Sequence, residues 1–132
     1  MPLNREIIAT QNAPAAIGPY SQAVHVGDFV YTAGQIPLVP ETGKLIEGGI
    51  EEQTRQVMQN LANILEAAGS SLAHIVKTTI FVTNLADFAA INKVYGSFFA
   101  SAPPVRSTVQ VAALPLGANI EIEAVAIRAG HS

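Results

Sequence analysis

Two stretches near the end of the chain decide the fold that we expect: residues 103–111 read PPVRSTVQV, and residues 119–128 read NIEIEAVAIR. In both, the residue types alternate with a period of two, so each is predicted to form a β-strand. The polar positions that would share a face are Arg106, Thr108 and Gln110 in the first strand and Glu121 and Glu123 in the second. If the two strands pair, an arginine and two carboxylates stand on one side of a sheet whose other side is apolar.

Arg106 is the first candidate functional residue in this arrangement. A guanidinium fixed on a rigid strand is a plausible receptor for a small carboxylic acid, because it can make two parallel hydrogen bonds to a carboxylate. The alternative is a surface or interface salt bridge between Arg106 and Glu121 or Glu123, and from the residues alone this is the more common arrangement. Glu121 has the same alternative role, as the partner of Arg106 in a salt bridge. Glu123 is interpreted as structural. Tyr20, taken by itself, is interpreted as a packed aromatic.

Composition limits the class of protein. The chain has 132 residues, which fits one domain over residues 1–132. Hydrophobic residues make up 49% of the chain and charged residues 13%, against roughly 25% charged in an average protein, so we expect another subunit to cover part of the surface. The net charge of −3 and the scattered basic residues argue against a dedicated nucleic-acid binder, which needs a basic patch.

Several other kinds of site and location can be judged from residue types. The absence of cysteine excludes a disulfide framework, a thiolate nucleophile and any cysteine-based zinc site. The three histidines, His25, His74 and His131, have no partners at metal-ligand spacing, so no metal site is predicted. No secretory signal is visible, and no apolar run approaches the ~20 residues of a membrane span. We therefore expect a soluble, cytoplasmic protein with no membrane partner.

The remaining sequence predicts the order of the elements. Further strands are expected over residues 5–10, 23–26, 29–33 and 75–83, helices over residues 50–68 and 85–99, and loops over residues 11–19 and 36–49. Asn84 is predicted to cap the second helix, and Gly34 marks a point where the backbone bends or admits a close neighbour.

The resulting order, β-β-β-α-β-α-β-β, predicts an α+β fold in which both helices cover one face of a single six-stranded mixed sheet. This follows because strand–helix–strand connections are almost always right-handed. The opposite face of the sheet would carry the polar side chains of the last two strands among apolar ones. Such a mixed face is most naturally covered by other copies of the same chain.

Five segments together carry a resemblance to a known family. They are residues 12–22 (NAPAAIGPYSQ), 32–37 (TAGQIP), 76–79 (VKTT), 104–109 (PVRSTV) and 120–124 (IEIEA). In this order and at this spacing, the chain resembles the RidA/YjgF family of reactive-intermediate deaminases over nearly its whole length. The resemblance implies a fold similar to the chorismate mutase-like homotrimer, in which the sheets face a central barrel and clefts lie between subunits.

The resemblance also implies an activity and a set of residues. The activity is that of a 2-iminobutanoate/2-iminopropanoate deaminase, which hydrolyses small enamines and imines such as 2-aminoacrylate to 2-keto acids and ammonia without a cofactor. Arg106 matches the arginine that grips the substrate carboxylate, Glu121 the carboxylate that positions or polarises the attacking water, and Tyr20 the pocket wall. Gly34 and Thr108 would present backbone groups to the ligand, Asn92 matches a recurrent helix asparagine, and Ala33 stands where serine is common.

Two other function classes remain open from the sequence. One is a regulatory or chaperone-like trimer that binds small carboxylates in the same pocket without turnover. The other is a translation-inhibiting endoribonuclease, an activity also ascribed to the family. The net negative charge of the chain argues against this activity.

Overall fold

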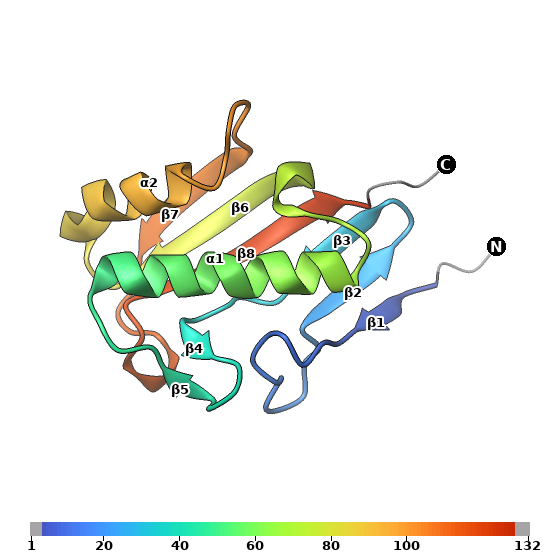
Figure 1. Ribbon diagram of the computed structural model, residues 1–132, viewed down its shortest axis with the longest axis horizontal. Coiled ribbons are helices and arrows are strands. Elements are labelled where there is room, and N and C mark those ends of the chain that lie inside the picture. Colours follow the sequence, from blue (N-terminus) through green and yellow to red (C-terminus); the bar gives the residue numbers. More distant parts are fainter. Residues whose placement is uncertain (1–3, 129–132) are drawn as a thin grey trace.

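A computed structural model of the chain describes residues 4–128 and contains one six-stranded sheet (Figure 1). Its strands are, in chain order, β1 (Glu6–Ile8), β2 (Ala23–Val26), β3 (Phe29–Thr32), β6 (Ile75–Val82), β7 (Val105–Gln110) and β8 (Ile120–Ile127). In space the order is β1-β2-β3-β8-β6-β7, and only β6 and β7 are parallel. The mixed sheet predicted from the sequence is confirmed.

Two helices, α1 (Ile50–Ala67) and α2 (Phe88–Gly96), cover one face of this sheet (Figure 1). The start of α1 is fixed by Glu52, whose carboxylate accepts a hydrogen bond of 2.9 Å from the amide of Gly49. Gly69 follows its end with a φ of +80°, the left-handed conformation that commonly terminates a helix. The predicted strands and helices agree with the structure to within a few residues at their ends.

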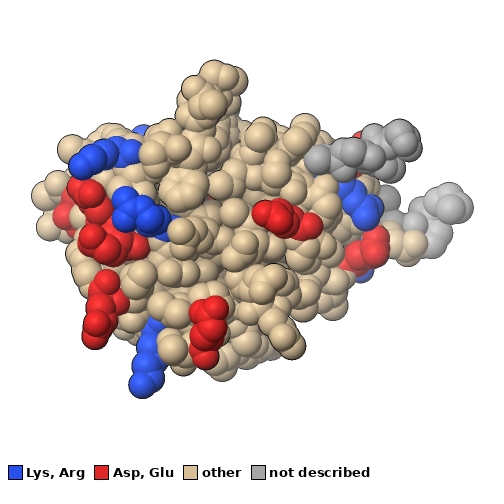
Figure 2. Space-filling model, in the orientation of Figure 1, with Lys and Arg blue, Asp and Glu red and all other residues tan. Residues whose placement is uncertain are grey.

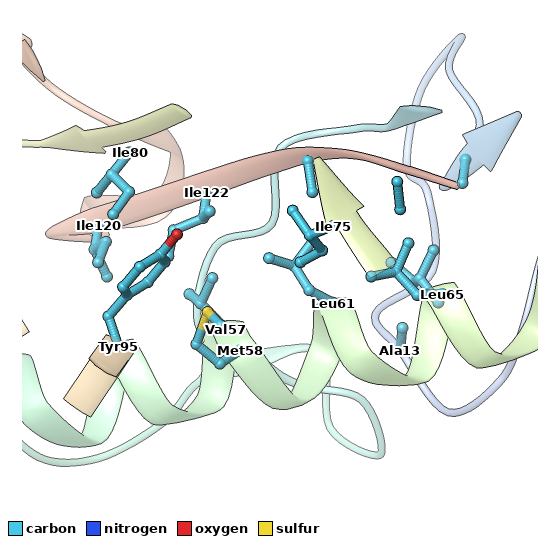
Figure 3. Packing of buried hydrophobic residues seen from close by; sticks show 14 of the residues in the cluster. Ala13, Val57, Met58, Leu61, Leu65, Ile75, Ile80, Tyr95, Ile120 and Ile122 are labelled. Carbon is cyan, nitrogen blue, oxygen red and sulfur yellow. The ribbon is translucent and has the colours of Figure 1, made fainter. Parts of the chain in front are cut away.

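The core lies between α1 and the central strands (Figure 3). Val57, Met58 and Leu61 point from α1 toward the sheet, where Ile80 and Ile122 meet them. All five side chains are fully buried, and the burial of each stabilises the fold by about 1.5–3 kcal/mol. The sheet is therefore a rigid base for the side chains that it presents on its two faces.

The last two strands of the chain do not pair with each other, unlike in the arrangement considered from the sequence. β7 and β8 do not pair, because β6 lies between them. Thr78 on β6 is opposite both Arg106 and Ala124, so Arg106 lies on the helix-covered face together with the buried residues of β8. Glu121 is opposite Phe81, which is three residues from Thr78 and hence on the other face. The prediction that Arg106 shares a face with Glu121 and Glu123 is wrong.

Smaller differences concern loops and helix ends. The segment 36–49, predicted as a loop, contains a second two-stranded sheet of β4 (Leu38–Val39) and β5 (Lys44–Leu45). Asn84 caps the short 3-10 helix η2 (Leu85–Asp87), which leads into α2, by accepting a hydrogen bond from the Ala86 amide. Two further 3-10 helices are η1 (Leu72–His74) and η3 (Pro115–Gly117). α2 ends at Gly96, earlier than predicted.

The face of the sheet opposite the helices, called the open face below, is rich in exposed apolar side chains. They include Phe29, Tyr31, Val109 and Ile127, each at least 40% exposed. Exposed apolar patches of this kind usually mark a surface that another molecule covers. No helix in residues 4–128 is both long and apolar enough to cross a membrane.

Candidate functional site

Arg106 lies on β7, at the edge of the sheet, and its side chain is held by α2. The Nη1 atom donates a hydrogen bond of 2.8 Å to Oδ1 of Asn92. The guanidinium carbon lies 5.4 Å from the centre of the Phe88 ring and 5.1 Å from the centre of the Tyr95 ring. No carboxylate oxygen among residues 4–128 lies within 4.0 Å of this group, so the salt bridge with Glu121 or Glu123 is not present in the chain.

A cleft of about 400 Å³ opens beside the guanidinium. Its lining consists of Asn92, Tyr95, Gly96, Phe99, Pro103, Pro104 and Arg106. The guanidinium has five N–H donors in a planar fork, and Asn92 uses only one of them. A positive charge at the wall of a cleft, with no acidic side chain of residues 4–128 in ion-pair contact, suits the binding of a small carboxylate.

Thr108 lies two residues from Arg106 on the same face of β7, opposite Ile80. Its hydroxyl oxygen is buried and has no hydrogen-bond partner among the described residues. A buried polar atom without a partner costs about 1–3 kcal/mol, so it needs an explanation. The unpartnered hydroxyl lies two residues along β7 from Arg106, and that Thr108 presents backbone groups to a ligand stays a prediction.

Glu121 lies on the open face and packs against the backbone of Gly34. A Cβ added to Gly34 would lie 2.7 Å from Cδ of Glu121 and closer still to Oε2, so only glycine leaves room for this carboxylate. Backbone hydrogen bonds in both directions between Gln35 and Ile122, of 2.8 and 3.1 Å, hold Gly34 in this place. Burial, with a smaller contribution from the negative charge of Glu123, raises the pKa of the Glu121 carboxyl above its usual range.

Tyr20 follows a loop that is fixed by a buried glutamine. The side-chain amide of Gln22 accepts a hydrogen bond of 2.7 Å from the amide of Thr10 and donates one of 2.8 Å to the carbonyl of Pro14. Tyr20 is 53% exposed, so its interpretation as a packed aromatic is wrong. Tyr20 and Ala33 line a groove of about 570 Å³ that also includes Val24.

A second cleft, of about 310 Å³, lies beside Tyr20 and Gly34. Its other lining residues are Pro14, Ala15, Ile17, Gln35, Ile36, Leu38, Pro115 and Leu116. Most of these residues are apolar, so the cleft can take a small aliphatic group beside Gly34, the residue against which Glu121 packs.

The predicted site residues therefore form two separate groups within one chain. Arg106, Asn92 and Thr108 form the arginine half-site at the β7 edge. Tyr20, Ala33, Gly34 and Glu121 form the glutamate half-site beside the end of β3. The sheet separates the arginine from the glutamate, since their side chains lie on its opposite faces. Arg106 and Glu121 therefore do not meet within one chain, whereas the family resemblance implies clefts that lie between subunits.

Phe88 and Tyr95 contact Arg106 but were not identified as site residues from the sequence. With Asn92 they occupy positions i, i+4 and i+7 of one helix face, a spacing that also describes an ordinary apolar stripe. The one feature of the sequence that could have indicated this contact is the polar residue Asn92 within the apolar stripe. An asparagine on an otherwise apolar, partly buried helix face needs a hydrogen-bond partner, and here the partner is the guanidinium.

Comparison with known proteins assigns the family. The sequence profile of the Endoribonuclease L-PSP family matches residues 10–128. The human 2-iminobutanoate/2-iminopropanoate deaminase is 48% identical over 126 residues, which cover 96% of this chain and 92% of the human protein. This chain belongs to the RidA/YjgF family.

Other RidA/YjgF proteins support the same assignment. The chloroplastic Reactive Intermediate Deaminase A of Arabidopsis thaliana is 48% identical over 124 residues, covering 94% of this chain and 66% of the longer plant protein. The crystal structure of E. coli TdcF with bound serine has a TM-score of 0.90 and 48% identity, covering 94% of this chain and 99% of TdcF. The α+β fold predicted from the RidA/YjgF resemblance is thus confirmed.

The contact between Gly34 and Glu121 leads to a prediction for Gly34→Ala. The added methyl group collides with the flexible end of Glu121 rather than with backbone, so the side chain can move away at little cost in stability. We expect the melting temperature to change little. For the imine hydrolysis that the family resemblance implies, we expect displacement of the carboxylate to lower the rate roughly tenfold, since misplaced groups lose proximity effects. The change should have little further effect in a Glu121→Gln background, and an equal loss there would contradict this explanation.

Proposed function

We propose that the protein hydrolyses small enamines and imines of 2-keto acids, such as 2-aminoacrylate, 2-iminopropanoate and 2-iminobutanoate, to the keto acid and ammonia. The observation that carries this proposal is the Arg106 guanidinium, which lies beside a cleft with no carboxylate partner in the described chain. The names of the human and Arabidopsis relatives support the same reaction class. The serine in E. coli TdcF also carries an α-carboxylate, which supports the substrate class.

The reaction needs modest machinery. Arg106 would hold the substrate carboxylate in a two-point contact and thereby fix the imine carbon. Glu121, when ionised, would orient a water molecule and take up its proton as the oxygen bonds to that carbon. Starting from the protonated imine, Glu121 would pass this proton to the nitrogen of the resulting aminol, the C–N bond would break and ammonia would leave. The remaining hydroxyl proton would be lost to the Glu121 carboxylate or to solvent as the carbonyl forms. An iminium carbon is already electrophilic, so no activated protein nucleophile is required.

This chemistry requires Arg106 and Glu121 to face one substrate, although they lie on opposite faces of one sheet. We propose that the protein is a homotrimer in which the arginine half-site of one subunit faces the glutamate half-site of its neighbour. The exposed apolar side chains of the open face support such an assembly, because a second copy would remove them from water.

The endoribonuclease named in the family description is not the activity that we favour. The net charge is −3, and Figure 2 shows acidic and basic side chains interspersed over the helix-covered side, without a broad basic patch. A surface that tracks an RNA backbone needs a concentration of positive charge. The cytoplasmic location expected from the sequence stays a prediction.

A coupled assay tests the proposal. A pyridoxal-phosphate dehydratase supplied with serine or threonine releases the imine, and keto-acid formation is followed with and without the protein. We expect the protein to raise the rate of imine loss above that in buffer and to sediment as a trimer. Saturable pyruvate binding without any rate increase would instead identify a ligand-binding protein, and a monomer in solution would contradict the shared cleft.

A further inference from the structure

One face of α2 is directed at the Arg106 guanidinium. Phe88, Asn92 and Tyr95 lie four and three residues apart, a spacing that places them in one row along the helix. Asn92 accepts a hydrogen bond from Nη1, and the two rings lie within 5.4 Å of the guanidinium carbon. The three side chains therefore contact the same group from successive turns of the helix.

This row is itself fixed to the sheet. The hydroxyl groups of Tyr95 and Thr78 form a buried hydrogen bond of 2.7 Å. Thr78 is the residue of β6 directly opposite Arg106 on β7, so the bond connects Tyr95 to the strand beside the one that carries the arginine. The Tyr95 ring also packs against Phe99, with 5.0 Å between ring centres. Tyr95 thus has little freedom to move away from Arg106.

The three side chains that contact the Arg106 guanidinium carry no charge. Aromatic faces attract a cation, and an amide oxygen accepts its hydrogen bond, but neither cancels its positive charge. Burial raises the pKa of the Tyr95 hydroxyl, so that this group stays protonated and neutral at physiological pH. A carboxylate in place of Asn92 would hold an arginine more strongly, but it would compete with any acid that the arginine is meant to bind.

We propose that Phe88, Asn92 and Tyr95, backed by Thr78, form a neutral clamp: they are positioning residues that aim the Arg106 guanidinium into the cleft while leaving its charge available for the substrate carboxylate. The neutral clamp rests on the proposed function, since it assigns a role to the side chains behind the carboxylate receptor. The neutral clamp also explains why Arg106 is held by two aromatic rings and an amide. An arginine with a purely structural role could be held by an ion pair instead.

The comparison of Asn92→Asp with Asn92→Ala separates this role from simple packing. Asp has nearly the same shape as Asn and adds a charge-assisted hydrogen bond to Arg106, so a structural role predicts that Asp is the milder change. The neutral clamp predicts the reverse. In titrations with pyruvate, we expect Asn92→Asp to raise Kd more than tenfold over the unmodified protein and more than Asn92→Ala does. Its melting temperature should be at least that of Asn92→Ala.

Kinetics in the coupled assay provide the second readout. We expect Asn92→Asp to raise KM while kcat falls by a smaller factor, because the new carboxylate competes with the substrate before the chemical step. An Asn92→Asp protein whose Kd and KM match those of the unmodified protein, or are better than those of Asn92→Ala, would overturn the neutral clamp.

Tyr95→Phe and Thr78→Val test the connection to the sheet. Each removes one partner of the buried hydroxyl pair and keeps the shape of the side chain. We expect each variant to weaken pyruvate binding severalfold, and the double variant to be no weaker than the worse single one, because both changes break the same bond. Pyruvate binding unchanged in both single variants would overturn the role assigned to Tyr95 and Thr78.

The proposed function and the neutral clamp can be tested separately. If the unmodified protein neither binds pyruvate nor accelerates imine loss, the proposed function fails and the neutral clamp fails with it. If the unmodified protein is active and binds pyruvate, but Asn92→Asp is as good a binder, only the neutral clamp is wrong.

Discussion

Arg106→Ala is expected to lower kcat/KM for imine hydrolysis by roughly 10²–10⁴-fold. Two hydrogen bonds between a guanidinium and a carboxylate contribute about 1.5–3 kcal/mol each, and every 1.36 kcal/mol is tenfold in rate. The loss should appear chiefly in substrate binding, because in the proposed mechanism Arg106 holds the carboxylate and not the reacting carbon. The coupled assay measures the loss, and pyruvate titration should show a matching decrease in affinity.

Arg106→Lys provides the sharper comparison. It keeps the positive charge but replaces the planar fork with a compact ammonium group, which cannot make the two-point contact. We therefore expect the lysine variant to be much closer to Arg106→Ala than to the unmodified protein. Arg55→Ala, which removes an exposed arginine from α1, is the matched control and should leave activity unchanged. Full activity of Arg106→Ala would refute the assigned role.

Glu121→Gln is expected to lower kcat by roughly 10²–10⁴-fold, the range of a general base, with a smaller effect on pyruvate binding. This pattern is the opposite of that for Arg106, since Glu121 would act on water and not on the substrate carboxylate. Single-turnover measurements with excess protein would separate the chemical step from binding. A kcat close to that of the unmodified protein would remove Glu121 from the mechanism.

The same substitution should not weaken the fold at neutral pH. Burial raises the pKa of Glu121 in the folded chain, so the folded state binds this proton more tightly than the unfolded state does. Ionisation of Glu121 therefore lowers the free energy of unfolding as pH rises from the usual glutamate range through the raised value. Glutamine lacks this ionisation. Glu121→Gln should thus be at least as stable as the unmodified protein at pH 7, and its advantage should disappear in acid.

Glu123→Gln is the matched control for the charge effect. Its exposed carboxylate raises the pKa of Glu121 through repulsion, although less than burial does. Removal of that charge should move the acidic limb of the pH–rate profile toward lower pH while kcat at neutral pH stays nearly unchanged. An acidic limb that does not move in Glu123→Gln and persists in Glu121→Gln would belong to another group.

The sequence was sufficient for elements whose pattern is local. The alternation in residues 120–127 identified β8 and its buried face, and the three-and-four spacing of α1 with Gly69 identified that helix and its end. The short strands β4 and β5 were missed, because two-residue strands between Pro and Gly positions leave no periodic signal.

The relation between Arg106 and Glu121 could not be predicted from the sequence. Which face a side chain occupies is fixed only when its strand has found its neighbours, and a shift of one residue reverses it. β6 lies between the two strands that follow it in the chain, a long-range choice that neither strand's own residues encode. The family resemblance supplied the residue set, whereas the contacts of Arg106 with Phe88 and Tyr95 required the structure.

The sheet that keeps Arg106 and Glu121 apart has a genetic consequence if the cleft is shared as proposed. A chain lacking the arginine and a chain lacking the glutamate carry damage in different halves of the cleft. When both are produced in one cell, mixed assemblies would include a cleft built from the two intact halves. Two alleles that are each inactive alone would then complement one another.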